Sequence, residues 1–302
     1  MIHPHYPTAE EVDAWCESLL KRAEGISVAA HPVDAPQYAY QLGVRHTSGN
    51  HYVAFESEGR TTFYGYWQPA SPKLAPVLFH LPGYGAEMSA HPELVIEGYN
   101  VLHVNPLGYC TPTGPSKPDC AWTVLPDTVK TKGKQGYVDW LMDAVLAVHW
   151  ALALPKVNPT RFGFFGSSQG GGTSLLMASI FADHGVRAIA ADVPFLTNFP
   201  LMLGRENKGA YAGASSAMKS KGGSAGEWKA LGYIDTLSHA HRLRLPTLLT
   251  AGSLDIATPP DSVAALFEAL PGTRSYTFLS GQGHGYTMPF IHLAKAWFKL
   301  YV

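Results

Sequence analysis

The sequence has few cysteines, little net charge and no long apolar run. Its three cysteines, Cys16, Cys110 and Cys120, form no C-x-x-C pair and leave an odd thiol whichever two are joined, so we expect a reducing, cytoplasmic compartment. With 22 basic and 23 acidic residues the formal net charge is −1, which offers no basic surface to nucleic acid or to an anionic membrane. No stretch is long enough to span a bilayer, so we expect a soluble protein.

Targeting and cofactor motifs are also missing. The N-terminus has neither a basic start nor an apolar core of the kind found in secretory signals. Neither G-x-G-x-x-G nor a Walker pattern occurs, so no nucleotide cofactor is expected. The His3/His5 and His239/His241 pairs have no companion cluster, and we interpret both as surface features, with no metal site. The expected partner is a small or neutral molecule.

The 302 residues, 46% of them hydrophobic and 15% charged, can form a sizeable core. From Pro76 onward, apolar runs alternate with helical patterns, which indicates a parallel sheet buried on both faces. We therefore expect one structural domain of the α/β class. Residues 1–75 would add an N-terminal helix and antiparallel strands, and residues 76–302 would form the α/β core, with a lid-like insertion at about 199–241.

The pattern predicts the following elements. The N-terminal part contains a helix over 8–24, opened by a capping box of Thr8 and Glu11, then a proline-punctuated connection and antiparallel strands over 38–46, 52–56 and 61–67. The parallel strands are expected over 77–81, 101–105, 161–165, 188–192, 247–251 and 275–279. The helices of the core are expected over 92–97, 137–154, 173–182, 260–270 and 288–299, and a second long irregular stretch over 107–134.

The motif G-x-S-x-G occurs at Gly166-Ser167-Ser168-Gln169-Gly170, between a predicted strand and a predicted helix. In that context the turn holds a serine in a strained conformation at the tip of the strand, and small residues on either side let strand and helix pass closely. Ser168 is therefore the candidate nucleophile. A five-residue match also occurs by chance in a chain with 30 glycines, and the strand before and the helix after it distinguish this one.

A serine hydroxyl needs a histidine to take its proton and a carboxylate to orient that histidine. In α/β-hydrolases these residues follow the serine in the order acid, then histidine. Asp255 comes just after the predicted strand 247–251, and His284 comes just after the last predicted strand. Both would lie at the same edge of the sheet as Ser168. Asp192, at the end of the strand that follows the nucleophile helix, is the alternative acid.

Two backbone N–H groups should stabilise the oxyanion that develops on the substrate carbonyl. One is the N–H of Gln169, directly after the nucleophile, and the other is the N–H of Tyr84 in the glycine-containing loop after the first parallel strand. An ordinary Pro-Gly turn is the alternative for that loop. The aromatic candidates for lining a substrate pocket, each of which could equally be a core residue, are Tyr84, Phe195, Trp228 and Tyr286.

These motifs resemble the acetyl xylan esterase and cephalosporin-C deacetylase group, family seven of the carbohydrate esterases. The resemblance spans about 76–284 and rests on Gly166–Gly172, on Ala191–Leu196, and on Gly136-Tyr137 with Asp143–Val145. It implies an α/β-hydrolase fold, removal of acetyl groups from decorated sugars, and a homo-oligomer. It also implies the triad Ser168, Asp255 and His284, with the backbone amides of Tyr84 and Gln169 as the oxyanion hole.

The chain departs from that family's pattern at two places. Pro106-Leu107-Gly108 stands where the family usually has Arg-Gly-Gln, and Gly285 stands where the family usually has Glu after the catalytic histidine. We therefore identify the chain as a divergent member.

The hypothesis is a serine esterase that removes small acyl groups, above all acetyl from acetylated sugars, through an acyl-enzyme. A prolyl oligopeptidase-like peptidase is one alternative, but a propeller-sized N-terminal domain is missing. A general short-chain carboxylesterase is another; an esterase for lipid-like esters should have an apolar lid, yet 199–241 is mostly small and polar. A non-catalytic binding protein with this fold is the third, and the ordered serine, acid and histidine argue against it.

Overall fold

The computed structural model describes residues 3–34, 49–70, 74–83, 90–106, 110–111, 114–115, 137–205, 211, 215–216, 218–219, 223–285 and 287–302. The predicted strand over 38–46 and most of the irregular stretch over 107–134 lie outside the described residues.

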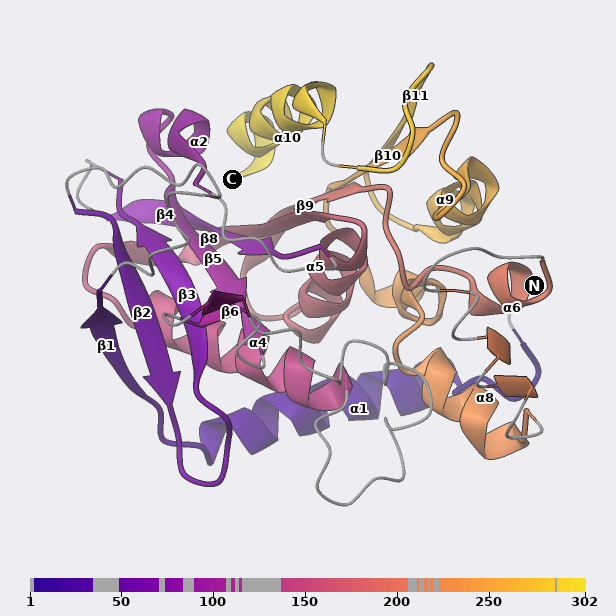
Figure 1. Cartoon of the computed structure of the whole chain (residues 1–302), viewed down its shortest axis with the longest axis horizontal. Helices are drawn as coiled ribbons and strands as arrows, with labels where there is room; N and C mark the ends of the chain where they lie inside the picture. The colour runs from indigo at the N-terminus through magenta and orange to yellow at the C-terminus, as the bar shows by residue number, and fades with distance from the viewer. Residues whose placement is uncertain are drawn as a thin grey trace.

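A nine-stranded sheet organises the described chain, in the order β1-β2-β3-β5-β4-β8-β9-β10-β11 (Figure 1). The strands are β1 Ala29–Val33, β2 His51–Glu56, β3 Phe63–Gln68, β4 Ala75–Leu81, β5 Asn100–Asn105, β8 Val157–Ser167, β9 Val186–Asp192, β10 Thr247–Gly252 and β11 Arg274–Leu279. β1, β2, β3 and β5 pair antiparallel, and every pairing from β5 through β4 to β11 is parallel. The mostly parallel α/β sheet predicted from the sequence is confirmed. A separate ribbon joins β6, Cys110–Thr111, to β7, Gly114–Pro115.

Strand β1 corrects the interpretation of the segment after the first helix. The sequence predicts a proline-punctuated connection here, but Ala29–Val33 pairs antiparallel with β2, with Pro32 opposite Val53. Proline cannot donate to a sheet ladder, so it is confined mainly to edge strands, where one side has no neighbour. Since β1 is the first strand of the sheet, it tolerates the proline that suggested a loop.

Helices cover both faces of the sheet. The helices are α1 Ala9–Glu24, α2 Pro92–Ile96, α4 Tyr137–Leu152, α5 Gln169–Ile180, α6 Phe199–Leu203, α8 Ala225–Gly232, the 3₁₀ helix η4 Thr236–Arg242, α9 Pro260–Ala269 and α10 Met288–Tyr301. Thr8 and Glu11 form the predicted capping box of α1. Figure 1 shows α2 and α10 on one side of the sheet, with α1 and α4 on the other.

The core follows from this layering, because neighbouring residues of one strand point to opposite faces. Phe164 belongs to the apolar cluster under α1, α4 and α5, whereas Phe165 belongs to the cluster under α2 and α10. Both side chains are fully buried, so the central strands read as continuous apolar runs, as the sequence predicted.

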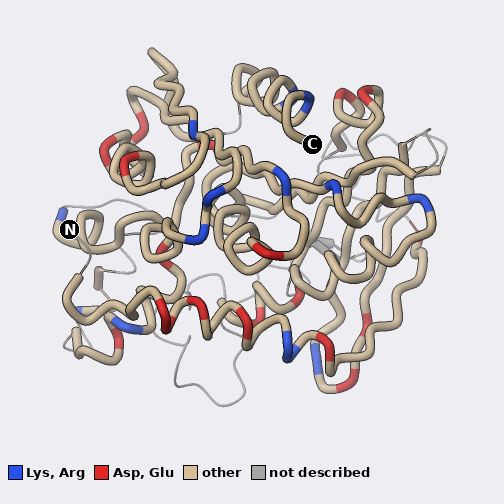
Figure 2. Tube along the Cα trace, turned by 180° about the vertical axis from the view of Figure 1, so that it is seen from behind, with Lys and Arg blue, Asp and Glu red and all other residues tan. Residues whose placement is uncertain are grey.

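Surface charge is mixed on the described trace. Figure 2 shows acidic and basic residues both spread over the back of the molecule, as expected for a net charge of −1. Within the ranges given above, no helix combines the length and hydropathy needed to cross a membrane. The cytoplasmic location expected from the cysteines stays a prediction.

Candidate active site

The turn at Ser168 joins β8 to α5. Ser168 lies between the last residue of the strand and the first of the helix, at φ 57° and ψ −119°, a region that non-glycine residues rarely adopt. Backbone hydrogen bonds hold it there: the N–H of Ser168 donates to the carbonyl of Asp192 (2.9 Å), and its carbonyl accepts from Phe195 (2.8 Å) and Gly172 (3.0 Å). The strained serine is thus held by the end of β9, by Phe195 in the segment that follows β9, and by the first turn of α5.

The glycines of the motif let this turn pack against its neighbours. A Cβ on Gly166 would lie 2.6 Å from the carbonyl oxygen of Leu81 at the end of β4. A Cβ on Gly170 would collide with the same carbonyl, and one on Gly172 would collide with the carbonyl of Phe195. All of these contacts are with backbone, which cannot rotate away. The first turn of α5 therefore lies as close as it does only because these positions lack side chains.

The structure brings the three predicted side chains within hydrogen-bond distance of one another. Nε2 of His284 lies 2.8 Å from Oγ of Ser168, and Nδ1 lies 2.9 Å from Oδ2 of Asp255. A carboxylate only accepts hydrogen bonds, so Nδ1 carries the proton and Nε2 presents a lone pair to the serine hydroxyl. This is the relay arrangement in which a histidine acts as base toward a serine.

Asp255 stays ionised although it is buried. Burial raises the pKa of its carboxyl, but hydrogen bonds from His284 and from the N–H of Thr258, together with the charge of His284, outweigh burial and lower the pKa below its ordinary value. Its Oδ1 accepts the backbone N–H groups of Ala257 (2.8 Å) and Thr258 (2.9 Å). The two backbone N–H groups on Oδ1 and the imidazole on Oδ2 therefore hold the carboxylate in one orientation.

Two residues that support this arrangement were not identified from the sequence. Oγ1 of the buried Thr258 lies 2.8 Å from Oδ2 of Asp255 and 3.4 Å from Nδ1 of His284. Gly252 ends β10, and a Cβ there would lie 2.6 Å from the carbonyl oxygens of Gln282 and Gly283. The loop that carries His284 can therefore lie against the end of β10. A glycine at the end of an apolar run was the available signal for such a close approach.

The expected oxyanion donors are only partly described. Gln169 is buried and is the first residue of α5, where a helix leaves its backbone N–H without an intrahelical acceptor. Gly83, the last described residue before position 84, lies close to the carbonyl of Ser167, so the loop enters next to the nucleophile turn. The predicted donor Tyr84 lies outside the described residues.

The aromatic candidates have different surroundings. Phe195 is partly buried, its N–H donates to Ser168, and its ring lies 4.4 Å from that of Tyr211. The ring of Trp228 stacks on His3 at 4.0 Å between centroids, so its described ring contacts are with the N-terminal segment rather than with the triad. Tyr286 lies outside the described residues.

The alternative acid is not the one that reaches the imidazole. The carboxyl of Asp192 accepts hydrogen bonds from Oγ of Ser167 (2.8 Å) and Oγ1 of Thr250 (2.5 Å), whereas Asp255 is the acid within hydrogen-bond distance of His284.

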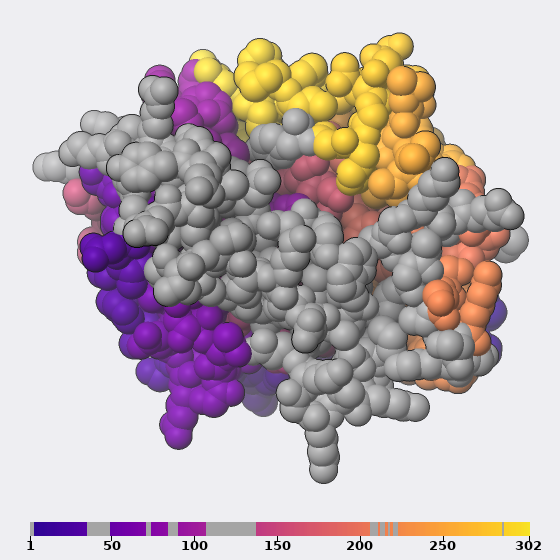
Figure 3. All heavy atoms as spheres, viewed as in Figure 1, coloured from indigo at the N-terminus to yellow at the C-terminus, as the bar shows by residue number. Residues whose placement is uncertain are grey.

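Figure 3 shows the C-terminal segments, which contribute His284, along the upper rim of the face seen there.

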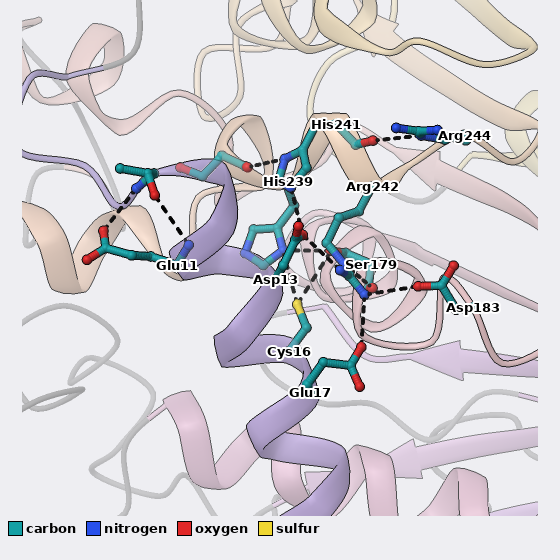
Figure 4. Close-up of polar contacts among 12 residues, drawn as sticks. Glu11, Asp13, Cys16, Glu17, Ser179, Asp183, His239, His241, Arg242 and Arg244 are labelled. Atoms are coloured by element: carbon teal, nitrogen blue, oxygen red, sulfur yellow. Dashed lines mark hydrogen bonds and ion pairs between the residues drawn. The ribbon is translucent and has the colours of Figure 1, made fainter.

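The expectation of a surface position is wrong for His239. This residue is fully buried, with Nδ1 2.8 Å from Oγ of Ser179 and Nε2 3.0 Å from the carbonyl of Tyr233. Its helix, η4, packs against α1 and α5, so residues distant in sequence cover the imidazole (Figure 4). Burial lowers its pKa to about 4. His241 is partly exposed, with Nε2 2.9 Å from Asp13 of α1.

Over the described residues, no group of three or more His, Cys, Asp or Glu side chains is arranged to hold a metal ion.

Comparison with known proteins relates this site to a family of esterases. A family model described as acetyl xylan esterase matches residues 42–301. Acetyl xylan esterase 1 from Thermoanaerobacterium sp. JW/SL YS485 has a similar structure, with a TM-score of 0.75 and 19% identity over 98% of this chain and 95% of that one. The acetyl xylan esterase from Paenibacillus sp. R4 matches with a TM-score of 0.77 and 17% identity, over 100% and 98% of the two chains. The Pyrococcus horikoshii acylaminoacyl peptidase matches at 0.61 and 18% identity, over 86% of this chain but 42% of its own.

Proposed function

The chain belongs to the acetyl xylan esterase family and is a serine carboxylic ester hydrolase, and we propose that it removes acetyl groups from acetylated sugars through a triad of Ser168, His284 and Asp255. The observation that carries this proposal is the chain of two hydrogen-bond distances, 2.8 Å from the serine to the imidazole and 2.9 Å from the imidazole to the carboxylate. It supports a serine activated for attack on an ester carbonyl.

Acylation begins when Nε2 of His284 takes the proton of Ser168 as Oγ bonds to the carbonyl carbon, whose oxygen becomes an oxyanion. The tetrahedral species then collapses and the bond from the carbonyl carbon to the sugar oxygen breaks. His284 returns its proton to that oxygen, so the sugar leaves as an alcohol. A water molecule, deprotonated by His284, attacks the acyl-serine in the same way and releases acetate and the free hydroxyl.

Asp255 keeps the imidazole in the productive tautomer. The lowered pKa of its carboxyl means that it is ionised throughout the neutral range and stabilises the imidazolium that forms in each transition state. Its hydrogen bonds from the backbone of Ala257 and Thr258 stop it from rotating away from Nδ1.

The oxyanion is assigned to two backbone donors, the N–H of Gln169 and the N–H of Tyr84. Gln169 supports the assignment because it opens α5, where a free backbone N–H and the positive end of the helix dipole both favour a developing negative charge. Phe195, Tyr84, Tyr286 and Trp228 remain the proposed sugar-contacting residues. Among those that the structure describes, Phe195 donates its backbone N–H to the carbonyl of the nucleophile.

The preference for small acyl groups and sugar esters rests on the family and on two similar solved structures, both of acetyl xylan esterases. The likeness to the acylaminoacyl peptidase, at 18% identity and over 42% of that chain, shows the fold alone and supports no peptidase assignment. A general short-chain carboxylesterase is the second candidate, and acyl-length preference together with sugar dependence separates it from a sugar deacetylase.

A fluorophosphonate probe tests the nucleophile. We expect the wild type to be labelled at Ser168 and Ser168→Ala to remain unlabelled. Ser167→Ala is the matched control, because it removes the adjacent hydroxyl and should keep the label. Hydrolysis of p-nitrophenyl acetate, butyrate and octanoate, followed by acetate release from acetylated oligosaccharides, tests the substrate. A preference for octanoate, or no acetate from any oligosaccharide, would refute the sugar-deacetylase assignment while leaving the esterase chemistry in place.

A further inference from the structure

A second carboxyl group is buried next to the nucleophile turn and takes no part in the mechanism described above. Asp192 ends β9, and its register partners are Ser167 at the end of β8 and Thr250 in β10. The side chain is fully buried, with Oδ2 2.8 Å from Oγ of Ser167 and Oδ1 2.5 Å from Oγ1 of Thr250. Its own carbonyl accepts the N–H of Ser168. Asp192 therefore connects three adjacent strand ends at the edge of the sheet where the nucleophile lies.

A carboxyl at such a position is unfavourable for packing alone. Burying an anion that receives only neutral donors is costly, and both hydroxyls that contact Asp192 are neutral. The charged groups that face it come from the loops after β10 and β11, namely Asp255 and His284. An imidazolium at His284 is therefore attracted by two carboxylates, one hydrogen-bonded to it and one buried at the end of β9, next to the nucleophile turn.

The balance of these contacts sets the charge of Asp192 close to neutral pH. Burial raises the pKa of its carboxyl to about 6, although the hydroxyls of Thr250 and Ser167 and the charge of His284 act in the opposite direction; Asp255 raises the pKa further. The group is thus ionised at pH 7 and neutral at pH 5.

From this placement we propose that Asp192 is a positioning residue for the triad, a second buried anion that stabilises the imidazolium of His284 and makes catalysis respond to pH by losing its charge. The inference rests on the proposed function, because it needs a proton to arrive on His284 during turnover. A group whose charge lies near the reacting centre lowers the barrier only in its ionised form.

The test compares kcat for p-nitrophenyl acetate between the wild type and Asp192→Asn across pH 5 to 8.5. We expect the ratio to approach one near pH 5 and to rise to about tenfold above pH 7, with a midpoint near pH 6. A purely structural role would lower kcat by the same factor at every pH, and a constant ratio overturns the inference.

Thr250→Val is the matched variant that keeps the carboxyl. It removes a hydroxyl that lowers the pKa of Asp192, so the loss of kcat on acidification should begin at a higher pH than in the wild type. This variant carries the test if circular dichroism shows Asp192→Asn to be unfolded, and an unshifted profile then counts against the inference. A wild type that is neither active nor labelled by fluorophosphonate overturns the proposed function as well, whereas an active wild type with a constant ratio overturns the inference alone.

Discussion

Buried histidines should make this protein lose stability steeply as the pH falls below about 6.5. His80 and His103 are both buried, their Nδ1 atoms lie 2.6 Å apart, and His239 is buried under α1. Burial lowers the pKa of His103 to about 3 and that of His239 to about 4, and it lowers that of His80 well below 6.5. All three imidazoles are therefore neutral in the folded protein at pH 5, whereas the unfolded chain protonates them.

The sign and the size of the effect follow from proton linkage. Below the unfolded pKa the unfolded state binds more protons than the folded state, so stability falls with pH until the folded pKa is reached. At pH 5, one such histidine costs about 2 kcal/mol relative to pH 8, starting from an unfolded pKa of about 6.5. Burial raises the pKa values of Asp192 and Asp235, so these carboxyls bind protons more readily in the folded state. They therefore offset part of the loss of stability that the histidines cause on acidification.

Removing one imidazole isolates its contribution to the pH dependence of the free energy of unfolding. His239→Gln should reduce the difference between the free energies of unfolding at pH 8 and pH 5 by about 2 kcal/mol, measured by urea denaturation at a series of pH values. Ser179→Ala is the control: it deletes the hydroxyl that contacts His239 but keeps the titrating group, so it should lower stability while retaining the pH dependence. Equal pH dependence in the wild type and His239→Gln would refute the reasoning.

Three further predictions concern catalysis. Ser168→Ala should lower kcat for p-nitrophenyl acetate by a factor on the order of 10⁴ with an unchanged circular dichroism spectrum, and a smaller loss would point to another nucleophile. Gly252→Ala should push the loop carrying His284 off the end of β10 and lower kcat about tenfold or more, and full activity would contradict the close approach. Thr258→Val removes a hydroxyl that holds Oδ2 of Asp255 beside Nδ1 of His284, so kcat/KM should fall, and an unchanged kcat/KM would contradict this supporting role.

Much of the fold could be predicted from the sequence because strands and helices follow from patterns of neighbouring residues. Apolar runs such as 162–165 are buried on both faces of a parallel sheet, and the runs predicted the parallel strands to within a few residues at each end. Strand β1 was missed because Pro32 is a local signal for a loop, and only its place at the edge of the sheet makes it compatible with a strand. His239 was misplaced because the residues that bury it come from α1 and α5, far away in sequence.

Neighbours along the chain are enough to identify the motif around Ser168, the chain order of serine, acid and histidine, and the edge of the sheet to which they belong. Which carboxylate reaches His284 depends on the folded structure, because Asp255 and Asp192 both lie at that edge and differ only in what surrounds them. The folded structure also decides the supporting contacts of Thr258 and Gly252. Such choices depend on ångström-scale distances between separate loops, and spacing along a chain does not encode these distances directly.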